Sequence, residues 1–330
     1  RDLLSGILES ESDITVIGTA SNGVEAVRLA RLLAPDIITM DINMPGMDGF
    51  EAARQIMEES PIPIIIISGV DNLAEIAASF RVMEAGALTI LPKPPHPTSP
   101  DFLNKSKDIL NAIRTYVEIR VIRRTKTHHS VKVTHEPVPN LNGVEPRLIV
   151  IGASTGGPPV IQTILRNLNS QFSIPLVLVQ HMSPGFILGF AEWLSESTGF
   201  RVTVPHNDEL LLPGSLYVVP DEVQAGVTSD LRIVLSDAPC EHNLRPSVSY
   251  LFRSVAETLG KNAVGILLTG MGTDGSHELL QMRKKGSVTI IQDKTSSVVY
   301  GMPGEALRIG AASMILSPEE IAQELKFIAR

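Results

Sequence analysis

The 330-residue sequence has little of several features, and each shortage excludes a class of protein. Its single cysteine, Cys240, cannot form an internal disulfide and fits a reducing cytoplasm. Acidic residues outnumber basic ones and give a net charge of −8, whereas a general nucleic-acid binder would be basic. No apolar run is long enough to span a bilayer, and no signal peptide opens the chain. We therefore expect a cytoplasmic protein that does not bind nucleic acid.

Aromatic residues are also scarce at 4%, although hydrophobic residues make up 43% of the chain. This composition predicts aliphatic cores, and the length predicts about two domains. Residues 121–145 have weak periodicity and carry basic residues and prolines, so we expect a linker there. The domains are then predicted at 1–120 and 146–330. Because His128, His129 and His135 lie in the linker, we discount them as catalytic or metal-binding residues.

Residues 1–120 alternate between strand and helix patterns. Apolar runs at 14–20, 36–40, 62–67 and 87–91 predict strands, and amphipathic stretches between them predict helices. This alternation is typical of a doubly wound parallel sheet, which binds ligands at the carboxyl ends of its strands.

Three polar residues, Asp41, Ser68 and Lys93, lie at such strand ends. Singly, they could be a turn residue, a helix cap and a solvated lysine. Together, the hydroxyl and the ammonium could hold a phosphoryl group on the carboxylate of Asp41.

Residues 146–330 repeat the alternation. Strands are predicted at 148–151, 174–179, 263–268, 288–291 and 312–316, and short strands between 212 and 236 predict an antiparallel addition. The predicted fold class is therefore α/β with two doubly wound parallel-sheet domains. The first would be flavodoxin-like, and the second Rossmann-like with the antiparallel elaboration.

The sharpest motif follows the first strand of the second domain. Gly152, Ser154 and Gly156 form the pattern G-x-S-x-G between that strand and two prolines suited to the first turn of a helix. A serine on such a corner can act as a nucleophile. Alternatively, it could cap the helix, or the turn could cradle the phosphates of a dinucleotide. A dinucleotide site is disfavoured because serine replaces its second glycine, and because the next strand ends in Gln180-His181 rather than in an acidic residue.

A nucleophilic serine needs a base and an acid on neighbouring strand ends. His181 ends the strand expected beside that of the serine. The candidates for the acid are Asp274, Asp293, Asp208 and Glu209. Spacing favours Asp274, in a glycine-rich loop after a long apolar strand, over Asp293, although Asp274 could also be a helix N-cap.

The first domain resembles the response-regulator receiver domain in the stretch D-I-N-M-P-G-M-D-G at 41–49, in Ser68 and in Lys93-Pro94. The resemblance implies that Asp41 is phosphorylated by a histidine kinase and that Ser68 and Lys93 respond to the phosphoryl group. It also implies a cis Lys93–Pro94 bond.

Receivers begin with a strand that ends in an acidic pair and helps to bind Mg²⁺, whereas this chain starts with the helix after it. No initiator methionine opens the sequence, so we expect the strand in the intact protein. In this chain, Asp41 and the carbonyl of Asn43 remain as the family-like ligands. Mg²⁺ is the cofactor expected for phosphorylation of the intact protein.

The second domain is similar to the catalytic domain of chemotaxis protein-glutamate methylesterases. The motifs are G-A-S-T-G-G at 152–157, Q-H-M at 180–182, R-P-S at 245–247, T-G-M-G-T-D-G at 269–275 and Y-G-M-P at 300–303. The resemblance implies a triad of Ser154, His181 and Asp274. It also implies oxyanion contacts near Thr155 or Met271, and no cofactor for ester hydrolysis.

A receiver, a linker and an esterase domain, in that order, form the layout of that family. The resemblance implies hydrolysis of glutamyl 5-methyl esters on methyl-accepting chemotaxis receptors to glutamate and methanol, and deamidation of receptor glutamines. A chemotaxis histidine kinase would be the phosphodonor, and the membrane would be reached only through the receptors. The unphosphorylated receiver would cover the active site. His277 departs from the small residues usual in the family, and we expect it to alter the rim of the site.

Two other classes of protein are weighed against the esterase. A binding module with an inactive triad would share these motifs. A DNA-binding response regulator would need a helix-turn-helix signal or a basic face after the linker, and the sequence has neither.

Overall fold

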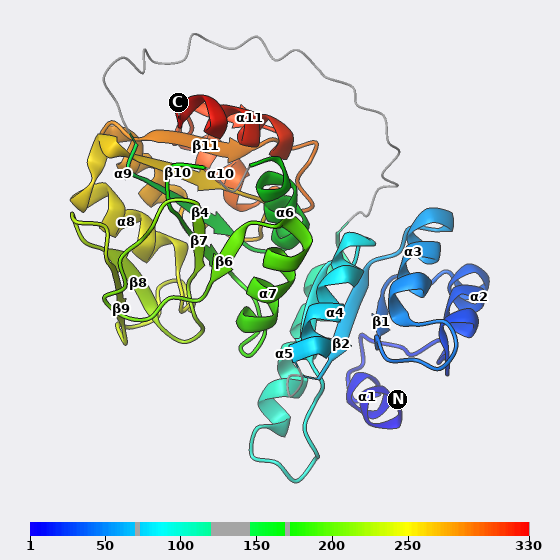
Figure 1. Ribbon diagram of the computed structural model, residues 1–330. Helices are drawn as coiled ribbons and strands as arrows, with labels where there is room; N and C mark the ends of the chain where they lie inside the picture. The colour runs from blue at the N-terminus through cyan, green and yellow to red at the C-terminus, as the bar shows by residue number, and fades with distance from the viewer. Residues whose placement is uncertain (70–72, 120–145, 169–171, 330) are drawn as a thin grey trace. The chain divides into compact units, whose positions relative to one another are not determined.

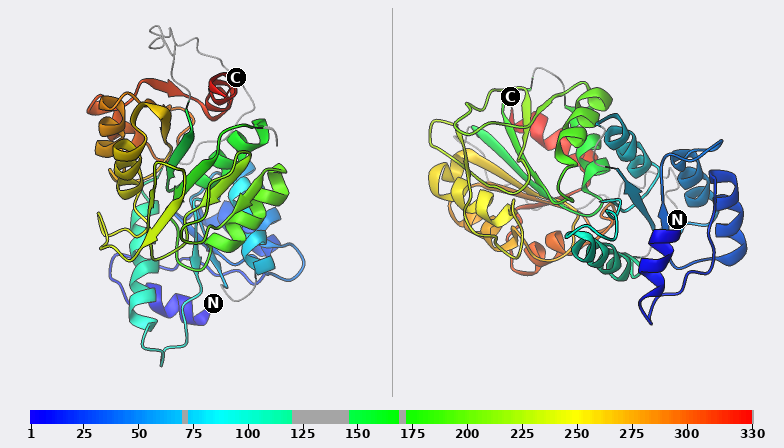
Figure 2. Two further views of the ribbon diagram at one scale, coloured as in Figure 1. Left: turned by 60° about the vertical axis from the view of Figure 1, so that its left-hand side comes forward. Right: turned by 90° about the horizontal axis from the view of Figure 1, so that it is seen from below.

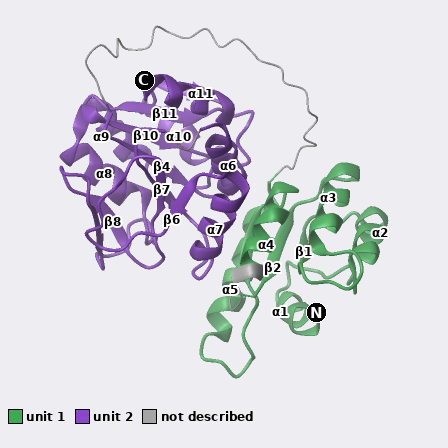
Figure 3. Cartoon of the chain, in the orientation of Figure 1, with its two compact units in different colours: residues 1–127 green, residues 128–330 purple. Residues whose placement is uncertain are grey.

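The computed structural model describes residues 1–69, 73–119, 146–168 and 172–329. The chain divides into two compact units, residues 1–127 and 128–330 (Figure 3), each with its own hydrophobic core. The predicted linker and its histidines lie outside the described residues. Within the described ranges, no helix is both long enough and apolar enough to cross a membrane.

The first unit contains a three-stranded parallel sheet in the order β1-β2-β3. Its strands are β1 (Ile38–Met40), β2 (Ile64–Ser68) and β3 (Thr89–Pro92), and its helices are α1 (Asp2–Glu9), α2 (Gly23–Leu33), α3 (Gly49–Glu59), α4 (Leu73–Glu84) and α5 (Phe102–Tyr116) (Figure 1). Every residue of the central strand β2 is buried. Asn22 and Asp48 cap α2 and α3 by accepting hydrogen bonds from backbone N–H groups in the first turn of each helix.

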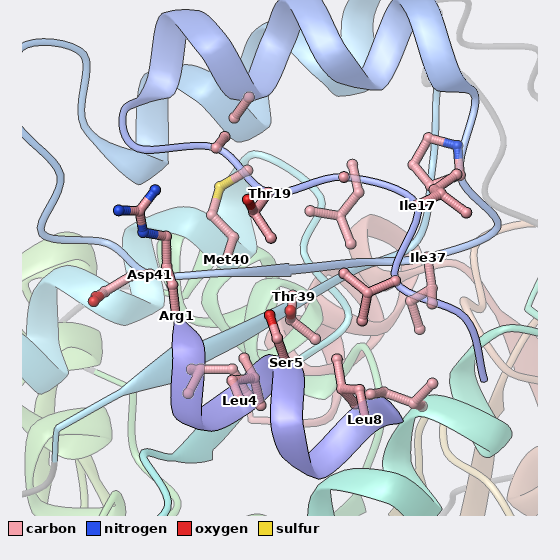
Figure 4. Close-up of a pocket in the computed structure, with 18 of the residues that line it drawn as sticks. Arg1, Leu4, Ser5, Leu8, Ile17, Thr19, Ile37, Thr39, Met40 and Asp41 are labelled. Atoms are coloured by element: carbon pink, nitrogen blue, oxygen red, sulfur yellow. The ribbon is translucent and has the colours of Figure 1, made fainter. Parts of the chain in front are cut away.

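Residues 14–20 do not form the predicted strand, so that prediction was wrong. They lie across a cavity of about 1000 Å³ from β1, with Ile17 and Thr19 on one side and Leu4 and Leu8 of α1 on another (Figure 4). A strand is defined by ladder hydrogen bonds to a neighbour. The cavity separates this segment from β1, and the segment pairs with none of the strands β1, β2 and β3.

The second unit contains a seven-stranded parallel sheet in the order β12-β11-β10-β4-β5-β7-β6. These strands are β4 (Leu148–Ala153), β5 (Leu176–Gln180), β6 (Arg201–Thr203), β7 (Ser215–Val218), β10 (Ala263–Leu267), β11 (Val288–Gln292) and β12 (Met314–Leu316). The antiparallel elaboration is the pair β8 (Gln224–Val227) and β9 (Ile233–Ser236). The predicted α/β fold class is confirmed.

Helices cover both faces of this sheet, as the two views of Figure 2 show. One group packs together as α6 (Gly157–Asn167), α7 (Ile187–Thr198) and α11 (Pro318–Ile328), and the other as α8 (Val248–Thr258), α9 (Ser276–Lys284) and α10 (Met302–Arg308). Strands buried on both faces must be apolar throughout, which explains the continuous apolar runs of β4, β5 and β10.

The fold predicts a large difference between two phenylalanines of this unit. Phe252 on α8 is fully buried in the core, whereas Phe327 on α11 is 62% exposed. Phe252→Ala should lower the free energy of unfolding by about 3–5 kcal/mol. Phe327→Ala, the control, should lower it by less than about 1 kcal/mol. Urea unfolding followed by the fluorescence of Trp193, the single tryptophan of the chain, reports on this unit. Equal losses from both variants would contradict the core assignment.

Candidate active site

The strand order brings three predicted site residues to one edge of the sheet. β4 lies between β5 and β10, and all three strands are parallel. Ser154 follows β4, His181 follows β5, and Asp274 lies in the loop after β10. The N–H of His181 donates to the carbonyl of Ala153 at 2.9 Å, so the histidine directly neighbours the serine turn.

Ser154 lies in a tight turn between β4 and α6, and the turn requires a positive φ at Gly156. Gly156, with φ 76°, is the N-cap of α6, and no side chain caps this helix. The interpretation of Ser154 as a helix cap is therefore wrong. The N–H of Ser154 donates to the carbonyl of Thr269 at 3.0 Å, across to the loop after β10. Gly270 allows this approach, because a Cβ at that position would lie 2.7 Å from the Cβ of Ser154.

The imidazole of His181 lies against the carboxylate of Asp274. Nε2 is 2.9 Å from Oδ2, and the two side chains are 11% and 3% exposed. Because Nε2 faces the aspartate, Nδ1 is the ring nitrogen left for a serine or a substrate.

The carboxylate of Asp274 is held by the N-terminus of α8. It accepts hydrogen bonds from the hydroxyl of Ser247 at 2.8 Å, from the N–H of Val248 at 2.7 Å and from the N–H of Ser249 at 3.0 Å. Unpaired N–H groups at a helix N-terminus stabilise an anion. Burial alone would raise the pKa of Asp274, but hydrogen bonds from His181, Ser247 and Ser249 outweigh burial and hold the pKa well below its ordinary value of 3.8.

Sequence reasoning gave no role to Ser247 or Ser249. The signal was present, because a serine directly before an amphipathic stretch is typical of a helix N-cap. The sequence could not show that the acceptor is the carboxylate of Asp274, which lies in a loop 25 to 27 residues away. The N-cap interpretation of Asp274 for its own helix is wrong, since Gly275 is the N-cap of α9 and no side chain caps it.

The other acidic candidates lie against different groups. The carboxylate of Asp293 accepts hydrogen bonds from Thr295 and Ser296 in its own loop. Asp208 lies 3.7 Å from Arg232, and Glu209 accepts from the N–H of His206. The structure therefore brings only Asp274, among these four described residues, to His181.

Three further residues named from the sequence lie around this edge. Thr155 is buried directly after Ser154, whereas Met271 is 44% exposed in the loop after β10. His277 is exposed in the first turn of α9.

In the first unit, the three predicted receiver residues lie at the ends of neighbouring strands: Ser68 ends β2, Asp41 follows β1 and Lys93 follows β3. Nζ of Lys93 is 2.8 Å from Oδ2 of Asp41, and both side chains are about two-fifths exposed. The buried hydroxyl of Ser68 instead accepts a hydrogen bond from Ser79 of α4 at 2.9 Å. The Lys93–Pro94 bond is not among the cis bonds of the described residues, so the cis prediction was wrong. With the bond trans, the Lys93 N–H pairs with Ser68 and its ammonium already reaches Asp41.

Of the two predicted Mg²⁺ ligands of this chain, Asp41 and the carbonyl of Asn43, the first lies beside Lys93. Mg²⁺ requires near-octahedral oxygen coordination. Among the described residues, no three His, Cys, Asp or Glu side chains cluster to hold a metal ion. The carboxylate of Asp41 is paired with an ammonium, and its Oδ1 lies 3.3 Å from the N–H of Asn43. Asp41 and the carbonyl of Asn43 would thus supply only two of the oxygen ligands, and Mg²⁺ binding by the intact protein stays a prediction.

The fold and the two sites define a protein that joins a receiver domain to a hydrolase domain. The CheB methylesterase family model matches residues 149–325, and the response regulator receiver domain model matches residues 1–99. The chain belongs to the CheB methylesterase family, which confirms the resemblance found in its motifs.

Relatives match almost the whole chain. A protein of Methanospirillum hungatei named protein-glutamate methylesterase/protein-glutamine glutaminase 2 is 58% identical over 330 residues, which cover 99% of this chain and 94% of that protein. A protein of Syntrophus aciditrophicus with the same name, numbered 1, is 46% identical and covers 100% of this chain and 95% of its own. The crystal structure of the Thermotoga maritima CheB methylesterase catalytic domain aligns with a TM-score of 0.53 and 32% identity, over 55% of this chain and 98% of that one.

The lowered pKa of Asp274 predicts a pH-dependent contribution to stability. A carboxyl group with a depressed pKa stabilises the fold above its unfolded value, here 3.8, and loses that stabilisation as the pH falls toward the folded value. The difference in unfolding free energy between wild type and Asp274→Asn should therefore shrink from pH 5 to pH 3. Urea unfolding at both pH values measures it, and a difference that stays constant would contradict the assignment.

Proposed function

We propose that the second unit hydrolyses glutamyl 5-methyl esters on methyl-accepting chemotaxis receptors, giving glutamate and methanol. The observation that supports this most is the buried Asp274–His181 pair beside the Ser154 turn. The names of the relatives add deamidation of glutamine, which we propose for the same site, with ammonia in place of methanol.

In the proposed reaction, His181 takes the proton of Ser154 while the serine oxygen attacks the ester carbonyl. Nδ1 acts as the base, because Nε2 faces Asp274. The aspartate fixes the tautomer of the ring and stabilises the imidazolium. His181 then protonates the departing methoxide, and methanol leaves an acyl-serine. Water, deprotonated by the same histidine, releases glutamate and regenerates the hydroxyl.

We propose that backbone N–H groups of Thr155 and Met271 bind the oxyanion of the tetrahedral intermediate. Thr155 follows the nucleophile directly, as does one donor of the oxyanion hole in α/β-hydrolases. A well-placed donor of this kind is worth about 3 kcal/mol of transition-state stabilisation.

We also propose that the receiver regulates the esterase. Asp41 would accept a phosphoryl group from a chemotaxis histidine kinase in the intact protein, and Lys93 would pair with its oxygens. The ion pair between these residues supports the proposal, because the ammonium of Lys93 lies beside the carboxylate that would be phosphorylated.

Methanol release from methylated receptor membranes tests the esterase. Wild type should release methanol, and Ser154→Ala should release none above background because the nucleophile is gone. Asp274→Asn should lower kcat by about 10⁴-fold, because the asparagine would no longer hold the imidazole of His181 in the tautomer that accepts the serine proton.

Asp293→Asn is the matched control for Asp274→Asn. The carboxylate of Asp293 accepts hydrogen bonds from its own loop, and the amide oxygen of asparagine can still accept one there. Turnover should therefore stay within a few-fold of wild type. Unchanged methanol release in Ser154→Ala would refute the nucleophile and favour a binding module.

Removal of residues 1–145 tests the proposed regulation. If the unphosphorylated receiver restrains the esterase, residues 146–330 should release methanol faster than the full chain at equal concentration. Ser154→Ala in the shorter chain is the control. Equal rates for the two lengths would count against restraint by the receiver.

A further inference from the structure

Gln180 makes contacts that link the two halves of the candidate active site. It is the last residue of β5 and is 2% exposed. Its Nε2 donates to the carbonyl of Ser154 at 2.9 Å and to the carbonyl of His181 at 2.9 Å. Both acceptors are carbonyl oxygens, so the NH₂ end of the amide must face them. One side chain therefore holds the main chain at the nucleophile and at the base.

The contact with Ser154 also fixes the direction of a neighbouring donor. In a planar trans peptide, the carbonyl of Ser154 and the N–H of Thr155 lie in one plane and point in opposite directions. That carbonyl accepts from Gln180 and, at 2.9 Å, from the N–H of Gly157. Two hydrogen bonds on the carbonyl fix the plane, and they polarise the peptide so that its N–H becomes a stronger donor.

The next peptide plane is anchored separately. The hydroxyl of Thr269 donates to the carbonyl of Thr155 at 2.9 Å, and the N–H of Thr269 donates to Gln292 at 2.8 Å. Thr155 therefore lies between two fixed peptide planes. Gln180 contacts the first of these peptides, the one that contains the N–H of Thr155.

The other end of the Gln180 amide explains the third glycine of the G-A-S-T-G-G motif, Gly157. Oε1 is buried without a hydrogen-bond partner and lies against Gly157 at the start of α6. A Cβ on Gly157 would overlap Oε1. Gly157 has no positive φ, so the absence of a side chain, rather than an unusual backbone, is what the position requires.

We propose that Gln180 is a positioning residue that aims the N–H of Thr155 at the oxyanion and keeps the serine turn in register with the His181 loop. The proposal rests on the proposed esterase function. Gln180 does not touch the reacting atoms, so its effect should fall on the transition state rather than on substrate binding.

Gln180→Met tests the proposal, because methionine keeps the length of the side chain and removes both donors. We expect kcat for methanol release to fall by about 10- to 100-fold, within the range that the loss of an oxyanion donor can cause. KM should stay within about threefold, since the ester is bound by other groups. Gln162→Met is the matched control, because Gln162 is also buried, at 4% exposure, but lies on α6 beyond the turn. It should retain kcat within about threefold.

Gly157→Ala is a second variant that tests the proposal while leaving Gln180 unchanged. The added Cβ should displace Oε1 and lower kcat in the same way. This variant keeps the test decisive if Gln180→Met folds poorly, which the fluorescence of Trp193 would reveal.

Amide resonances provide a readout that does not depend on turnover. The ¹H and ¹⁵N shifts of Thr155 should move in Gln180→Met and not in Gln162→Met. An unchanged Thr155 resonance, or a kcat loss in Gln180→Met no larger than in Gln162→Met, would overturn the proposal. If neither the full chain nor residues 146–330 release methanol, the esterase proposal fails on its own, and the resonances still decide whether Gln180 positions Thr155.

Discussion

The parallel pairing of β4 with β5 on one side and β10 on the other is the constraint on which the candidate active site depends. Parallel strands end at the same edge of a sheet, so the residues after these three strands meet although they are up to 120 positions apart in the sequence. The register of each ladder then fixes their relative depth. Ala153 pairs with Gln180, which leaves Ser154 and His181 side by side at the next position. Ligands of doubly wound sheets bind at edges of this kind.

The main charge of the candidate active site is the buried carboxylate of Asp274. Asp274 is 3% exposed, and burial of an isolated anion would be strongly unfavourable. The N-terminus of α8 supplies donors that offset this cost, and the carboxylate remains charged beside His181. The same helix therefore packs its apolar face into the core through Phe252 and holds the acid of the candidate triad with its first turn.

The first unit contrasts with the second in how its charges are held. Asp41 and Lys93 are paired but about two-fifths exposed, and exposed ion pairs contribute only about 0–1 kcal/mol to stability. Such a weakly held pair can exchange partners at little cost. The sheet itself stops at β1, because the segment at 14–20 lies across a cavity rather than in the ladder.

By itself, the sequence determined the two α/β units, nearly all of their helices and strands, and the positions of Ser154, His181 and Asp41 at strand ends. Local patterns suffice for these because burial on both faces demands apolar runs, and because turns and helix starts have characteristic residues. Spacing favoured Asp274 over Asp293 only slightly, since both follow strands that neighbour each other, and the motif resemblance then implied Asp274. The tertiary structure decided that Asp293 accepts hydrogen bonds within its own loop, that α8 anchors Asp274, and that Gln180 contacts both carbonyls. It also decided that residues 14–20 pair with no strand in the described part of the chain. Each of these depends on which distant group lies within about 3 Å, and hydrogen-bond distances of that kind are set by packing rather than by local pattern.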